Sequence, residues 1–150
     1  MVLFLPEILL MDSIKVYTAT EEEKTEIQNK IRTLLKKERK IVFAFLHGSF
    51  LSDTPFRDID IGILVEEISP SEYYNYEFEL SEKIRSAINV PYDVDVKVIN
   101  KAPLSFRFHV IRGRAIYSKD PELIDEYIIS TARFYFDIQP LRRRYILEQD

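Results

Sequence analysis

Cysteine is absent from the 150-residue sequence, and histidine occurs only as His47 and His109. Without thiols, the chain can form no disulfide, no thiolate zinc site and no cysteine nucleophile. Because so few histidines also disfavour a histidine-rich metal site, we expect any bound metal to use oxygen ligands. Oxygen ligands favour Mg²⁺ or Mn²⁺.

The sequence also lacks a hydrophobic run long enough to anchor it in a membrane. Residues 1–11 are apolar, but Pro6 and Glu7 interrupt them and the segment is too short to span a bilayer. The segment has neither the basic start nor the small-residue cleavage site of a signal peptide. We therefore expect a cytoplasmic protein whose N-terminus packs on the body as a strand or helical turn.

No repeat, low-complexity tract or linker rich in Pro, Gly or Ser divides the chain. A single domain over residues 1–150 is the simplest interpretation, with an N-terminal extension (1–19) and a C-terminal helical segment (120–150). The residues are 46% hydrophobic and 31% charged, which allows a core in a soluble chain. The formal net charge of -4 does not favour a nucleic-acid partner.

Hydrophobic periodicity predicts helices that alternate with short strands. One helix is predicted to begin after Thr20 and to close with the basic residues Lys36, Lys37, Arg39 and Lys40. Other helices are predicted from Ser69-Pro70 to Pro91, over residues 104–111, and from Asp120-Pro121 to a break before Pro140. Strands are predicted over residues 41–46, 58–65, 92–99 and 115–117. This order indicates an α/β or α+β fold.

Acidic and aliphatic residues alternate in two of the predicted strands. Residues two apart point to the same face of a strand, so Asp58 projects with Asp60, and Asp93 projects with Asp95. If the strands are neighbours in one sheet, these carboxylates gather on one surface and raise one another's pKa. A divalent cation removes this conflict, and adjacent carboxylates can bridge two metal ions.

Gly48-Ser49 follows the first predicted strand at a turn that exposes backbone N–H groups. Glycine permits close approach of a triphosphate, and the serine hydroxyl can donate to a phosphate oxygen. We expect the neighbouring His47 to be packed or hydrogen-bonded rather than to contact a nucleotide. An Asp-x-Asp pair or a Gly-Ser pair alone usually belongs to a solvated surface, whereas this succession of strand, Gly-Ser, loop and acidic strands is far more specific.

The segments HGSF and RDIDIGIL resemble the signature of polymerase-β-type nucleotidyltransferases. The segment VDVKVINKAPLSFRFHVIRGRAIYS resembles the downstream part of the minimal nucleotidyltransferases (MNT). The resemblance covers about residues 20–137 and is closest to MNT antitoxins paired with HEPN toxins. It implies a polymerase-β-like fold, with a mixed sheet flanked by helices and a long C-terminal helical segment.

By this resemblance, Gly48 and Ser49 hold the triphosphate of ATP, and Asp58 and Asp60 bind Mg²⁺. Asp95 is implied as the third carboxylate, which completes the metal site and helps to deprotonate the acceptor hydroxyl. Spacing alone leaves Asp93 open as a rival for that role.

The chain departs from its relatives in the loop after Gly48-Ser49. Leu51, Ser52 and Asp53 stand where many relatives have a small residue, Arg and Gly, and the loop is slightly short. Arg57 replaces a common serine, and it either contacts a phosphate or pairs with Asp53. These differences bear on nucleotide affinity and base preference.

The resemblance implies transfer of AMP from ATP to a hydroxyl, which we expect to be a tyrosine of a HEPN toxin, so that the chain acts as an antitoxin. One alternative is a small-molecule acceptor. Another is a non-catalytic partner that masks a toxin through its C-terminal helix.

Two exposed surfaces are also predicted. The last helix carries more apolar residues than a small domain usually hides, which indicates a partner or a homo-oligomer face: Phe134, Tyr135, Phe136, Ile138, Leu141, Tyr145 and Ile146. Arg142–Arg144 either bind phosphates or, as is usual for such runs, form a solvated helix end. Tyr73, Tyr74 and Tyr76 are expected to pack mainly in the core, or else to form a partner surface.

Overall fold

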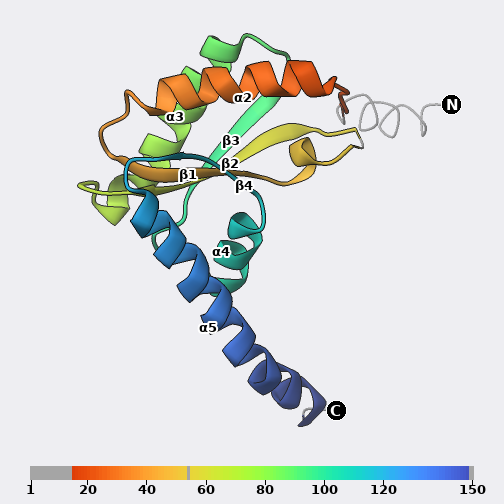
Figure 1. The fold of residues 1–150 in the computed structure, drawn as a ribbon, viewed down its shortest axis with the longest axis vertical. Coiled ribbons are helices and arrows are strands. Elements are labelled where there is room, and N and C mark those ends of the chain that lie inside the picture. The colour runs from red at the N-terminus through yellow and green to blue at the C-terminus, as the bar shows by residue number, and fades with distance from the viewer. Residues whose placement is uncertain (1–14, 54, 149–150) are drawn as a thin grey trace, which may run out of the picture.

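The fold is centred on a four-stranded mixed sheet with the order β3-β2-β1-β4, as shown in Figure 1. This computed structural model describes residues 15–53 and 55–148, so the prediction for residues 1–11 lies outside the described residues. The strands are β1 (Ile41–His47), β2 (Asp58–Val65), β3 (Asp93–Val98) and β4 (Arg114–Ser118). β1 is antiparallel to β2 and β4, whereas β2 and β3 are parallel. The predicted α+β class is confirmed.

Helices cover both faces of the sheet (Figure 1). α2 (Glu21–Leu35) and α3 (Tyr73–Ile88) lie on one face, and α4 (Leu104–Ile111) and the start of α5 (Pro121–Glu148) lie on the other. Alternate side chains of β2 point to opposite faces of the sheet. Ile59, Ile61 and Ile63 are fully buried on the face covered by α2 and α3, in one cluster with the apolar residues of these helices. On the other face, a Cβ atom on Gly62 would lie 2.7 Å from Val110 of α4, so this glycine permits close helix packing.

Of the basic residues predicted to close α2, Lys36 caps the helix, whereas Lys37, Arg39 and Lys40 lie beyond its end. The helix begins as expected, with the Thr20 hydroxyl accepting a hydrogen bond from the Glu23 N–H. It ends at Leu35, where Lys37 and Glu38 donate to the carbonyls three residues before them. These short-range hydrogen bonds form the turn that leads the chain into β1.

α3 follows a 3₁₀ turn, η3 (Pro70–Glu72), as the Ser69-Pro70 pair predicted. Pro91 does not end this helix, because α3 already stops at Ile88 and Asn89 adopts a left-handed conformation with φ 50°. Of the tyrosines at its start, Tyr74 is exposed, whereas Tyr73 and Tyr76 are half-buried.

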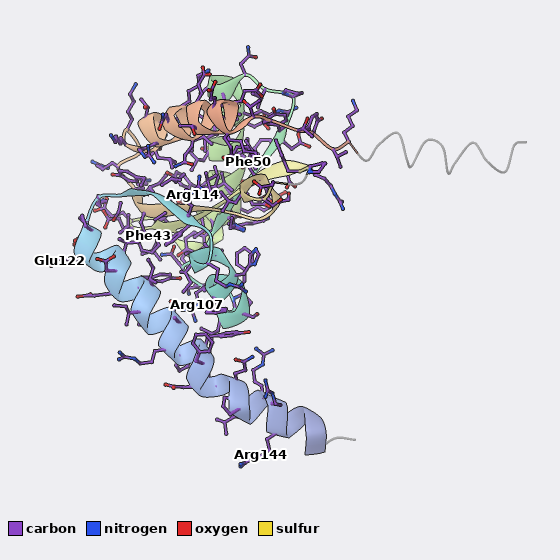
Figure 2. All side chains as sticks on the ribbon, turned by 45° about the vertical axis from the view of Figure 1, so that its right-hand side comes forward. Phe43, Phe50, Arg107, Arg114, Glu122 and Arg144 are labelled. Atoms are coloured by element: carbon purple, nitrogen blue, oxygen red, sulfur yellow. The ribbon has the colours of Figure 1, made fainter. Side chains whose placement is uncertain are left out.

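α5 continues through Pro140, so the predicted break before this residue was wrong. A proline removes one backbone donor and crowds the preceding turn, but the hydrogen bonds of neighbouring residues carry the helix onward. The later part of α5 extends away from the sheet, as the position of Arg144 shows in Figure 2. Phe134, Phe136 and Leu141 are exposed there. No helix in the part of the chain that the structure describes has the length and apolar character to cross a membrane.

Candidate active site

Strand register brings the predicted site residues together. Asp60 of β2 is the register partner of Asp95 on β3, and Asp58 is the partner of Asp93. On the other side of β2, Asp60 pairs with His47 of β1. Asp60 therefore lies between Asp95 and the strand end that leads into Gly48. We call Asp58, Asp60 and Asp95 the carboxylate cluster.

The carboxylate cluster lies on the sheet face that packs against α4, just beyond the part of that face which the helix covers. Gly62 is buried against Val110 of α4, whereas Asp60 and Asp58, which continue the same face of β2, are only half-buried. Asp95 is also half-buried. The cluster is thus shielded from bulk water on the strand side and open on the other, as an active site requires.

The electrostatics of Asp60 reflect this crowding. Burial, the negative charges of Asp58 and Asp95, and a hydrogen bond with Asp58 raise the pKa of Asp60 to about 7. Lys97 opposes this shift. At neutral pH the Asp58–Asp60 pair therefore holds a proton for part of the time, a conflict that a bound cation can relieve.

Gly48 forms one wall of the cluster. Its φ of 82° and ψ of -160° lie in a region that is essentially restricted to glycine. A Cβ atom at this position would lie 2.4 Å from Asp60 Oδ2. Any side chain here would therefore both strain the backbone and collide with the carboxylate, which explains why this turn contains glycine.

Ser49 opens a short 3₁₀ turn, η2 (Ser49–Leu51), and is exposed. The Ser49 carbonyl accepts hydrogen bonds from the Ser52 N–H at 3.0 Å and the Ser52 hydroxyl at 2.9 Å. These bonds fix the turn, so that the Ser49 side chain is presented beside Gly48. A loop was predicted over residues 50–57, and η2 forms its first part.

Lys24 of α2 supports this turn, a role that the sequence analysis missed. Its ammonium donates to the Ser52 carbonyl at 2.7 Å and lies 5.5 Å from the centre of the Phe50 ring. Lys24 is only 9% exposed. The sequence spacing could have predicted this burial. Lys24 lies three residues before Ile27 and seven before Ile31, and this spacing places it on the apolar face of the helix.

His47 is packed, in agreement with the first part of its prediction. It is 5% exposed and makes edge contacts with Phe106 and His109 of α4, with ring centres 5.7 and 5.2 Å away. Burial and the nearby His109 lower the pKa of His47 to about 4. Neither of its ring nitrogens has a hydrogen-bond partner within residues 15–53 and 55–148. His47 is therefore neutral at physiological pH and packs against the rings of α4.

The two acidic residues of β3 have different surroundings. Asp93 is exposed and pairs with Arg85 at 3.5 Å, where its side chain is 77% exposed. Asp95 lies opposite Asp60, affects the pKa of both Asp60 and His47, and is 3.7 Å from the Lys97 ammonium. The geometry therefore favours Asp95 over Asp93 as the third carboxylate.

Arg57 precedes the cluster and is exposed. No ion pair joins it to Asp53 among the residues that the structure describes. The pairing with Asp53 is thus not observed, and a phosphate contact stays a prediction for this residue.

The carboxylate cluster fits a hard divalent cation by its chemistry. In the described part of the chain, no group of three or more acidic or histidine side chains is already arranged to hold a metal ion. The Asp58 and Asp60 carboxyls share a hydrogen bond, and Asp95 faces Lys97. Both are side-chain contacts, so a cation can replace them without altering strand pairing. The donors are all oxygens, as Mg²⁺ requires.

Solved structures show the same fold. A chain of a Shewanella oneidensis complex, tri-AMPylated HEPN toxin with MNT antitoxin, is 23% identical with a TM-score of 0.63, over 83% of this chain and 97% of that one. A toxin-antitoxin MntA-HepT structure has 22% identity, a TM-score of 0.62 and the same coverage. A toxin-antitoxin structure with AMP-PNP has 25% identity and a TM-score of 0.64, over 81% of this chain and 96% of that one.

The sequence itself matches the family described as Polymerase beta, Nucleotidyltransferase over residues 29–122. This range includes Gly48, Ser49 and the whole carboxylate cluster. No curated protein matches the chain. Because the family match spans more than half of the sequence and the fold agrees with it, the chain belongs to the polymerase-β nucleotidyltransferase family.

Proposed function

We propose that this protein is a Mg²⁺-dependent nucleotidyltransferase that transfers AMP from ATP to a hydroxyl of a HEPN toxin, a tyrosine by preference, and thereby acts as an antitoxin. The observation that carries this proposal is the position of Asp60. It pairs in register with Asp95 on one side, and its carboxylate lies against Gly48 on the other.

Gly48 and Ser49 would bind the triphosphate. The bare Gly48 backbone leaves room for phosphate oxygens beside Asp60, and the exposed Ser49 hydroxyl can donate to them. Arg57 is exposed just before β2, where its charge can contribute to the same contact. These groups hold the phosphates that leave as pyrophosphate.

Asp58, Asp60 and Asp95 would hold Mg²⁺, which when bound neutralises charge on the triphosphate and on the leaving pyrophosphate. Asp95 would accept the proton of the acceptor hydroxyl, because it is half-buried at the side of the cluster remote from Gly48. The acceptor oxygen then bonds to the α-phosphorus, the bond from that phosphorus to the bridging oxygen breaks, and pyrophosphate leaves.

The choice of ATP and of a toxin acceptor is supported by the solved structures, which include a tri-AMPylated HEPN toxin with MNT antitoxin and a toxin-antitoxin complex with AMP-PNP. We assign the same class of nucleotide and partner to this chain. Such a pair would meet in the cytoplasm.

A second candidate is a non-catalytic antitoxin that masks its partner by binding alone. The exposed apolar side chains Phe134, Phe136 and Leu141 on the projecting part of α5 favour it. In this case nucleotide binding would not be required for protection.

One assay separates these functions. The protein is incubated with Mg²⁺, ATP labelled at the α-phosphate and a candidate HEPN partner. Label transfer that disappears in Asp58→Ala/Asp60→Ala but persists in the surface control Asp125→Ala supports the transferase. A stable complex without transfer supports masking, and transfer only to a small hydroxylated molecule supports a small-molecule acceptor.

A further inference from the structure

We propose that the acceptor enters from the β3 side, and that a groove between α3 and β3 binds a tyrosine-bearing segment with basic neighbours. This inference rests on the proposed function and specifies its acceptor site. The groove has a volume of about 270 Å³, and its lining includes Tyr74, Phe78, Glu82, Arg85, Asp93 and Asp95. Asp95 belongs both to this groove and to the carboxylate cluster, so the groove leads directly to the site.

Strand order determines the side of attack. The sheet runs β3-β2-β1, which places Asp95, then Asp58 and Asp60, then Gly48-Ser49 across the site. Phosphoryl transfer requires the attacking and leaving oxygens to lie roughly in line on opposite sides of phosphorus. If pyrophosphate leaves toward Gly48-Ser49, the acceptor oxygen must arrive from the β3 side. β3 is an edge strand of the sheet, and α3 packs beside it.

The open edge of β3 cannot bind the acceptor as an added strand. The Val96 N–H donates to the Ser81 hydroxyl at 3.1 Å, and the Val98 N–H donates to the Glu77 carboxylate at 2.8 Å. Because α3 occupies these edge donors, recognition must use side chains instead of strand pairing. The groove is therefore a side-chain binding surface.

The side chains of the groove specify the class of segment. Tyr74 is 76% exposed and Phe78 is 63% exposed, so both present aromatic surface to a partner. The lining contains the carboxylates of Glu77, Glu82, Asp93 and Asp95 against only two cations, Arg85 and Lys97. Aromatic rings favour an aromatic acceptor, and the acidic excess favours Lys or Arg beside it.

A titration tests binding without catalysis. The full ¹⁵N-labelled protein, with Mg²⁺ and AMP-PNP, is titrated with Lys-Lys-Tyr-Lys-Lys or Glu-Glu-Tyr-Glu-Glu, and its amide resonances are followed. The basic peptide is expected to shift residues 74–85 and 93–97 and to bind about 10-fold more tightly than the acidic one. Equal binding of the peptides, shifts confined to α5, or no shifts at millimolar peptide would each overturn the assignment.

Variants then connect the groove to transfer. Phe78→Ala and Glu82→Lys are expected to raise KM for the HEPN partner about 10-fold, while kcat and the affinity for Mg²⁺–AMP-PNP stay unchanged. The matched controls are Ile129→Ala and Glu126→Lys, which alter exposed residues of α5 that precede residue 134. A rise in KM in the α5 variants instead would move the docking site to that helix.

The two proposals fail differently. If the unaltered protein does not bind Mg²⁺–AMP-PNP, or if transfer persists in Asp58→Ala/Asp60→Ala, the transferase proposal is wrong. If transfer depends on those aspartates but Phe78→Ala and Glu82→Lys leave KM unchanged, only the docking groove is wrong.

Discussion

The carboxylate cluster and the distal arm of α5, residues 134–144, differ in how their side chains are held. In the cluster, Asp60 is half-buried among like charges, and Gly48 permits its carboxylate to lie against the backbone. In the arm, Phe134, Phe136 and Leu141 are exposed. Figure 2 shows Arg144 at the far end of the arm, away from the sheet, whereas Phe50 lies at the sheet beneath α2.

This difference indicates two kinds of functional surface. The cluster holds groups whose mutual repulsion is a cost to folding and is relieved by binding a cation. The arm exposes apolar area that contributes little to the stability of the isolated chain and that a partner can cover. Changes in the cluster should therefore affect both stability and activity, whereas changes at the exposed residues Phe134 and Leu141 of the arm should affect only association.

The largest effect is expected for Asp60→Asn. Loss of one carboxylate from the cluster should lower the rate of transfer about 10³-fold, in the range seen when a preorganised electrostatic group is removed. The melting temperature of the protein without Mg²⁺ should rise, because repulsion with Asp58 and Asp95 is removed. Transfer assays and thermal unfolding, with Asp125→Asn as the control, measure both. Retained activity would contradict the role of Asp60.

Gly48→Ala should destabilise the fold through two separable causes. The backbone conformation alone should cost about 1–3 kcal/mol, and the collision with Asp60 Oδ2 should add to it. In an Asp60→Ala background the collision is absent, so the same glycine substitution should cost less. Chemical denaturation of the four chains in this double-mutant cycle gives the coupling. A coupling of zero would show that the collision is relieved by other means.

The pH dependence of stability should reveal His47 and Asp60 as opposing groups. The pKa of His47 falls from 6.5 to about 4 on folding, so the unfolded chain binds the extra proton between these values and stability rises with pH. The pKa of Asp60 rises from 3.8 to about 7, so the folded chain binds the extra proton and stability falls with pH.

Two variants separate these contributions. In Asp60→Asn, stability should rise by up to about 3 kcal/mol as the pH increases from 4 to 6.5. In His47→Phe, stability should instead fall as the pH increases from 4 to 7. The unaltered chain should show a shallower dependence than either variant. Thermal unfolding followed by circular dichroism at several pH values tests this, and parallel curves for all chains would refute it.

The smallest effect on stability is expected in the distal arm. Phe134→Ser and Leu141→Ser should change the free energy of unfolding by no more than about 0.5 kcal/mol, since both residues are exposed. Phe50→Ala, which removes a ring that is 2% exposed, should cost about 3–5 kcal/mol. Urea denaturation compares them. A large loss in the arm variants would show that the arm is packed in solution, as in a homo-oligomer.

The sequence by itself determined the strands, their faces and the residues that could form the site. A period of two directs Asp58 and Asp60 away from Ile59 and Ile61 whatever the neighbours are, and Gly48 marks a turn that other residues cannot adopt. The long C-terminal helix was also expected, although its passage through Pro140 was not, because a single unfavourable residue is outweighed by the helical turns around it.

Only the tertiary structure decided which distant residues meet. Periodicity fixes the face of a strand but not its register, so the choice of Asp95 over Asp93 opposite Asp60 depends on how β2 and β3 pair after the α3 crossover. In the same way, the burial of Lys24 and the contacts of His47 with Phe106 and His109 arise from helix packing, which no local pattern encodes.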